Sequence, residues 1–142
     1  MRARGKKLAV TNGCFDILHT GHVTYLEAAR NCGDVLLVGV NADASVGANK
    51  GPQRPVNSEQ DRVAVLAALA SVDGVCIFSE RTATNFLKLA QPDVYVKGGD
   101  QNLTTVPAEE LQAVEQCGGK VVFAPFVRGK STTALLEKIA RL

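Results

Sequence analysis

The sequence has no long apolar run and almost no net charge. Its longest apolar stretches are only as long as a β-strand, so we expect no transmembrane helix. The basic start, 1–7, precedes an apolar run that is too short for a signal peptide. A formal net charge of +2 is too small to indicate nucleic-acid binding by itself. We therefore expect a cytoplasmic protein that binds neither membranes nor nucleic acids, with residues 1–142 forming one domain.

The sequence also lacks paired cysteines. Its four cysteines, at positions 14, 32, 76 and 117, form no Cys-x-x-Cys pair. Reduced thiols are therefore expected rather than disulfides or a structural zinc site. Cys14, His19 and His22 could supply three ligands to one metal, but no fourth ligand accompanies them, so we expect no metal held by the protein alone.

Strand-like and helix-like segments alternate along the chain. Helical spacing of apolar residues predicts helices at about 21–31, 58–71, 83–90, 107–116 and 131–141. Short runs that contain Val predict strands at Leu8–Thr11, Val35–Val40, Gly74–Phe78, Asp93–Val96 and Lys120–Ala124. This alternation is typical of an α/β protein. We predict a Rossmann-like, doubly wound, open parallel sheet of about five strands with helices on both faces. The stretch 41–57 is predicted to be a long irregular loop.

Polar and basic residues follow four of the predicted strands. These segments are Thr11–His22, which contains both histidines of the chain, 41–57, Lys97–Asp100 and 126–133. In a parallel sheet the four segments share one rim, where helix N-termini offer free N–H groups to anions. The sequence therefore predicts a site for nucleotide phosphates.

His19 and His22 are the strongest catalytic candidates in this segment. Their spacing of three around a helix start directs both rings to one side, where they can stabilise charge on a phosphate. Gly21 between them allows a ligand to approach the backbone closely. The dinucleotide motif Gly-x-Gly-x-x-Gly is absent, and Gly129-Lys130-Ser131 lacks the first glycine of a P-loop.

Two motifs resemble those of a known superfamily. Asn12-Gly13-Cys14-Phe15-Asp16 followed by His19-Thr20-Gly21-His22 resembles the first signature of the HxGH nucleotidylyltransferases, and Arg128-Gly129-Lys130-Ser131-Thr132-Thr133 resembles the second. Within that superfamily the chain is most similar to the heptose 1-phosphate adenylyltransferases of ADP-heptose synthesis, through Gly39–Asp43, Arg54–Asn57, Val72-Asp73 and Val96–Asp100. Gln101-Asn102 departs from that family, which tends to have an aromatic residue after the aspartate.

The resemblance implies an adenylyltransferase that moves AMP from ATP to a sugar 1-phosphate, heptose 1-phosphate in particular, and releases pyrophosphate. It implies Mg²⁺ bound with ATP, a separate sugar kinase that supplies the acceptor, a role in lipopolysaccharide biosynthesis, and a homodimer. The catalytic residues would be His19, His22, Lys50 and Arg128. The nucleotide would contact Asn12, Gly13, Cys14, Phe15, Gly21, Lys97, Gly98, Asp100, Ser131 and Thr132. The acceptor would contact Asp16, Asp43, Lys50 and Arg54, with Asp16 ordering the turn rather than acting as a base.

Two alternatives remain open from the sequence. A cytidylyltransferase acting on glycerol 3-phosphate or another small phosphate carries similar signatures. A nucleotide-binding sensor could keep the phosphate site without catalysis, although His19, His22 and Arg128 together favour an enzyme.

Overall fold

The fold is a five-stranded parallel sheet, which the computed structural model describes over residues 5–125, 127 and 129–142. The strands are β1 (Leu8–Gly13), β2 (Val35–Asn41), β3 (Gly74–Phe78), β4 (Val94–Gly98) and β5 (Lys120–Ala124). Their order is β3-β2-β1-β4-β5, and every neighbouring pair is parallel. The order runs outward from β1 in both directions, so a crevice opens beside β1 at the carboxyl ends of the strands.

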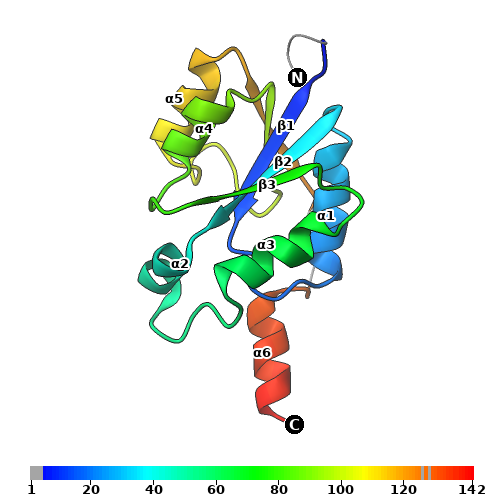
Figure 1. The fold of residues 1–142 in the computed structure, drawn as a ribbon, viewed down its shortest axis with the longest axis vertical. Helices are drawn as coiled ribbons and strands as arrows, with labels where there is room; N and C mark the ends of the chain where they lie inside the picture. The colour runs from blue at the N-terminus through cyan, green and yellow to red at the C-terminus, as the bar shows by residue number, and fades with distance from the viewer. Residues whose placement is uncertain (1–4, 126, 128) are drawn as a thin grey trace.

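Helices cover both faces of this sheet. They are α1 (Thr20–Arg30), α2 (Asp43–Lys50), α3 (Glu59–Ala67), α4 (Thr84–Ala90), α5 (Ala108–Gln116) and α6 (Thr132–Ala140). Figure 1 shows α1 and α3 on one side of the sheet and α4 and α5 on the other. The predicted doubly wound α/β fold is therefore confirmed.

Apolar side chains that alternate in direction along the strands form two hydrophobic cores, one on each face of the sheet. Ala9 of β1 and Val96 of β4 pack in the same buried cluster as Leu26 of α1 and Leu66 of α3. Their neighbours Val10 and Tyr95 face the opposite way, where they form the second cluster with α4 and α5. Because successive side chains of a strand point to opposite faces, this alternation also decides on which face the polar residues at the strand ends lie.

The prediction of one irregular loop over 41–57 was wrong, because the first half of the stretch forms α2. Local preference for this helix is weak, since the segment contains Gly47 and Asn49. Tertiary contacts stabilise it instead. Val46 is completely buried, and Glu59 Oε1 accepts a 2.9 Å hydrogen bond from the Asp43 N–H at the start of the helix.

The last helix, α6, extends beyond the carboxyl ends of the strands and away from the body of the molecule (Figure 1). None of its residues is buried. Among the residues that the structure describes, no helix combines the length and the apolar character needed to cross a membrane.

Candidate functional site

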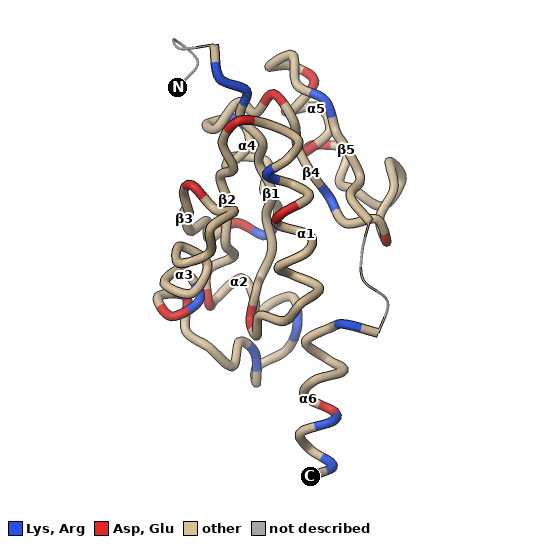
Figure 2. The backbone as a smooth tube through the Cα atoms, turned by 90° about the vertical axis from the view of Figure 1, so that its right-hand side faces the viewer, with Lys and Arg blue, Asp and Glu red and all other residues tan. Residues whose placement is uncertain are grey.

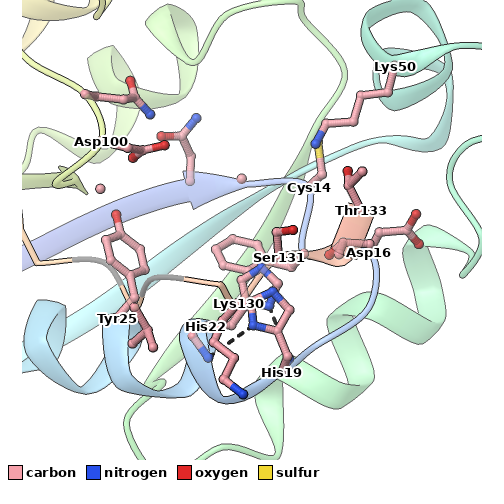
Figure 3. Close-up of a pocket in the computed structure, with 18 of the residues that line it drawn as sticks. Cys14, Asp16, His19, His22, Tyr25, Lys50, Asp100, Lys130, Ser131 and Thr133 are labelled. Atoms are coloured by element: carbon pink, nitrogen blue, oxygen red, sulfur yellow. Dashed lines mark hydrogen bonds between the residues drawn. The ribbon is translucent and has the colours of Figure 1, made fainter. Parts of the chain in front are cut away.

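A cavity of about 420 Å³ opens at the crevice predicted by the strand order. Its walls come from the turn between β1 and α1, the end of α2, the end of β4 and the start of α6. Figure 3 shows His19, His22 and Lys130 together at one side of this cavity, and Tyr25 and Asp100 at the other. Segments that lie more than a hundred residues apart in the sequence therefore form one site.

Both histidines cap the N-terminus of α1. His19 is the capping residue, and its Nδ1 accepts a 3.1 Å hydrogen bond from the Gly21 N–H. The Nδ1 of His22 in turn accepts a 3.3 Å bond from the His19 N–H. With both Nδ1 atoms acting as acceptors, each neutral ring carries its proton on Nε2. The Nε2–H groups are then available as donors to an anion in the cavity.

The surroundings of both rings also lower their tendency to be protonated. Their centroids lie 3.9 Å apart. Burial, followed by the nearby His19 and Lys50, lowers the pKa of His22 to about 4. Burial, followed by the charge of Lys130, also lowers the pKa of His19. Without a bound anion both rings are therefore neutral donors at neutral pH.

The lowered pKa of His22 predicts that acid destabilises the fold. In the unfolded chain His22 binds a proton near pH 6.5, whereas in the folded chain it does so near pH 4. Between these values the unfolded state binds more protons, so the free energy of unfolding decreases as the pH falls through this window. Urea unfolding at about pH 7.5 and about pH 5.5 should show a smaller decrease for His22→Asn than for the unchanged protein. An equal decrease in the free energy of unfolding of both proteins would contradict the lowered pKa of His22.

The start of α6 is attached directly to the α1 turn. Ser131 caps α6 by accepting a 2.9 Å bond from the Ala134 N–H, and the Thr132 hydroxyl donates to the Ile17 carbonyl over 3.2 Å. Gly21 permits this close approach: a β-carbon there would lie 2.8 Å from His19 Cε1 and 3.1 Å from Lys130 Cβ. The two helix N-termini therefore present their free N–H groups to the same cavity.

Positive charge predominates on the cavity wall. Lys50, Lys97 and Lys130 line it, together with Arg54, which forms an ion pair of 2.8 Å with Asp16. Figure 2 shows basic segments after α2 and at the start of α6, at the same end of the molecule. Burial lowers the pKa of Lys97, although Glu110 and Asp100 oppose this effect. The wall suits a ligand with several negative charges.

Asp16 fixes the loop that closes the cavity beside α2. Its buried carboxylate accepts bonds of 2.9 Å from the Val56 and Asn57 N–H groups, in addition to the Arg54 contact. Burial alone would raise the pKa of Asp16, but these bonds from Asn57, Val56 and Arg54 hold it below its ordinary value. The side chain thus orders the turn and the loop, as expected of it.

Asp43, predicted to contact the acceptor, is not on the cavity wall. Its Oδ1 accepts a 2.7 Å bond from Arg62 Nη2. Arg62 is unusual for an arginine, because its charged side chain has no exposed surface. Its guanidinium also donates to the carbonyls of Cys14, Asn41 and Asn57, at 2.7, 2.8 and 3.1 Å. Asp43 therefore belongs to a structural network behind the site.

Nearly all the other predicted residues lie on the wall. The cavity is lined by Asn12, Gly13, Cys14, Phe15, Asp16, His19, Gly21, His22, Lys50, Arg54, Lys97, Gly98, Asp100, Ser131 and Thr132. Arg128 lies outside the described residues. The cavity is also lined by Tyr25, Gln101, Val127, Lys130 and Thr133, which were not named as individual contacts of a substrate, although the last three belong to the predicted segment 126–133. Tyr25 could have been found, because it follows His22 by three residues on the same helix. Lys130 and Thr133 flank the predicted Ser131-Thr132 pair.

Comparison with protein families adds an independent finding to this geometry. Residues 10–138 match the family model described as cytidylyltransferase-like. The chain is 53% identical over 138 residues to the bifunctional protein HldE of Ectopseudomonas mendocina, covering 97% of this chain and 29% of that protein. The HldE of Trichlorobacter lovleyi is 49% identical, with 97% and 28% covered. The chain thus spans less than a third of the length of these relatives.

Solved structures show the same fold. A lipopolysaccharide core biosynthesis protein from Thermoplasma volcanium superposes with a TM-score of 0.71 at 28% identity, covering 89% of this chain and all of that one. The pantothenate synthetase of Thermus thermophilus superposes with a TM-score of 0.55 at 18% identity, covering 86% and 56%. The latter supports the fold alone.

Proposed function

This chain belongs to the cytidylyltransferase-like family, and from that premise we propose that it transfers AMP from ATP to heptose 1-phosphate and releases pyrophosphate. Family membership agrees with the nucleotidyltransferase motifs identified in the sequence. The identities of the nucleotide and of the acceptor are what we propose.

One observation carries this proposal: the two motifs meet at one cavity. The His19–His22 pair and the Ser131–Thr133 segment line the same wall, and Lys50 and Lys130 add positive charge beside them. A triphosphate needs such a combination of helix N-termini, neutral N–H donors and ammonium groups. Among the described residues of the wall, Ser131 and Thr132 bond to backbone groups rather than to His19 or His22, which agrees with direct transfer rather than a covalent intermediate.

In the proposed reaction an oxygen of the sugar phosphate attacks the α-phosphorus of ATP in line. The bond between the α-phosphorus and its bridging oxygen to the β-phosphorus breaks, and the electron pair leaves with pyrophosphate. The Nε2–H groups of His19 and His22 stabilise the charge that develops on the departing phosphates. Lys50, at the end of α2, faces the same cavity and neutralises phosphate charge from the other side.

We expect Mg²⁺ to accompany ATP and neutralise part of the phosphate charge. Within the described residues no group of three His, Cys, Asp or Glu side chains could hold a metal. The donors present fit an ion carried mainly by the triphosphate, with Asp100 on the cavity wall as the available carboxylate.

The choice of heptose 1-phosphate rests on the motif resemblance, together with the relatives reported above. The HldE relatives are about half identical over this whole segment, and the Thermoplasma structure is titled a lipopolysaccharide core biosynthesis protein. The relatives are called bifunctional and are much longer. We propose that a sugar kinase supplies the phosphorylated acceptor. The homodimer implied by the motifs stays a prediction.

A pyrophosphate-release assay tests the proposal. ATP and CTP are each combined with heptose 1-phosphate, mannose 1-phosphate and glycerol 3-phosphate, with Mg²⁺ present. We expect the fastest release from ATP with heptose 1-phosphate, and a product with the mass of ADP-heptose. Fastest release from CTP with glycerol 3-phosphate would replace this proposal by a cytidylyltransferase. Tight ATP binding without release from any acceptor would indicate a sensor.

A further inference from the structure

A chain of buried polar side chains leads from α5 to the cavity wall. Glu110 of α5 is only 3% exposed and Tyr95 of β4 is completely buried. The Tyr95 hydroxyl lies 2.8 Å from Glu110 Oε1 and 2.6 Å from Asn12 Oδ1. Asn12 Oδ1 also accepts a 3.2 Å bond from Lys97 Nζ. Asn12 and Lys97 line the cavity, whereas Tyr95 and Glu110 do not.

Tyr95 holds both cavity residues from behind. Its hydroxyl contacts the Asn12 amide, and its ring lies under the Lys97 ammonium, with Nζ 5.2 Å from the ring centroid. Burial and the nearby Glu110 raise the pKa of Tyr95, so the hydroxyl keeps its proton. Since Asn12 Oδ1 is used by these contacts, its Nδ2 group and Lys97 Nζ are the groups that can donate to a ligand.

Glu110 fixes the position of Tyr95. Its second oxygen, Oε2, accepts a 3.0 Å bond from the N–H of Ala83, which precedes α4. The carboxylate therefore connects α5, the start of α4 and β4 within the apolar cluster that covers this face of the sheet. Burying such a group costs free energy that an apolar side chain would not cost. The buried carboxylate of Glu110 is explained by its contact with Tyr95, which in turn contacts the cavity residue Asn12.

The sheet face decides which substrate these donors meet. Asn12 and Lys97 follow Val10 and Tyr95 by two residues, so they lie on the face covered by α4 and α5. The histidines and the start of α6 lie at α1, on the opposite face. If the triphosphate occupies the α1 side, Asn12 and Lys97 face the other substrate.

From this geometry, and resting on the function proposed above, we propose that Glu110 is a positioning residue for acceptor binding. Acting through Tyr95, it holds Asn12 and Lys97 as paired donors to the oxygen atoms of the sugar phosphate. This assigns Asn12 and Lys97 to the acceptor, whereas the motifs alone assigned them to the nucleotide.

Steady-state kinetics of three variants and one control test this inference. Tyr95→Phe keeps the ring under Lys97 but removes the hydroxyl, and Glu110→Ala removes the anchor. Each should raise the KM for the acceptor about tenfold, the scale of one lost hydrogen bond, and leave the KM for ATP within about twofold. Glu110→Gln keeps an acceptor for Ala83 and a polar contact for Tyr95, so it should restore a near-normal KM. Glu109→Ala, on the exposed neighbouring residue, is the matched control.

The side-chain amide signal of Asn12 in ¹⁵N-correlated NMR spectra gives a readout without turnover. It should shift in Tyr95→Phe and Glu110→Ala, but not in Glu110→Gln or Glu109→Ala.

Loss of stability with an unchanged acceptor KM and an unchanged amide signal would overturn the positioning role. A raised KM for ATP alone would overturn the assignment to the acceptor. If Glu110→Ala does not fold, the acceptor KM and the amide signal of Tyr95→Phe test the positioning role. Absence of turnover in the unchanged protein would refute the proposed function, while the NMR comparison still tests the positioning.

Discussion

Replacing His22 with alanine is expected to slow pyrophosphate release by about a hundredfold or more, the usual scale for losing one donor that stabilises charge in a transition state. The His22 Nδ1 is occupied by the His19 N–H, which leaves its Nε2–H for the phosphates. The substitution removes that donor and one cap of α1. Losing the cap costs about 1 kcal/mol of stability, so the variant should still fold.

Val23→Ala is the matched control for this substitution. Val23 follows His22 on α1, but its side chain is 36% exposed and does not line the cavity. Its removal should leave the rate of pyrophosphate release unchanged. Initial rates at saturating ATP and acceptor, with the circular dichroism spectrum of each variant, separate loss of chemistry from loss of fold. An undiminished rate in His22→Ala would contradict the role given to this ring.

The histidine pair was accessible from the sequence because local spacing alone determines its geometry. A spacing of three residues at a helix start favours the same side of the helix for both side chains. The same holds for the strands, whose apolar runs need a sheet that is covered on both faces. The five predicted strands each overlap an observed strand, and the predicted helices around them are found with small shifts of their ends. Fold and site position therefore followed from short-range patterns.

The features that could not be predicted from the sequence depend on contacts between segments that lie far apart in the chain. Helix α2 forms through burial of Val46 and a bond that the Asp43 N–H donates to Glu59, and its weakly helical sequence predicts neither contact. Asp43 follows a strand, as a ligand-binding residue would, yet its partner is Arg62, nineteen positions later. A charged residue in a helical segment is ordinarily expected to face solvent. The part played by Arg62 therefore became visible only in three dimensions.

Substituting Arg62 is expected to destabilise the fold strongly, although the residue lies outside the cavity. Its guanidinium donates to the carbonyls of Cys14, Asn41 and Asn57, and to the Asp43 carboxylate. Arg62→Met would keep most of the volume and leave the three carbonyls and the carboxylate without this donor. We expect the free energy of unfolding to fall by about 3–5 kcal/mol, the cost of breaking a buried charged network by removing one partner. Urea unfolding followed by circular dichroism measures this change.

Methionine replacement of a buried ionic network can be neutral when all partners become apolar together. Three partners of Arg62 are backbone carbonyls, which no side-chain substitution removes, so the penalty cannot be relieved in this way. Arg62→Lys should recover only part of the stability, because an ammonium lacks the planar fork that reaches several acceptors at once. Arg81→Met, at an exposed arginine, is the control and should stay within about 0.5 kcal/mol of the unchanged protein. Equal stability of Arg62→Met and this control would show that the network does not hold the Cys14 turn and the end of β2 together.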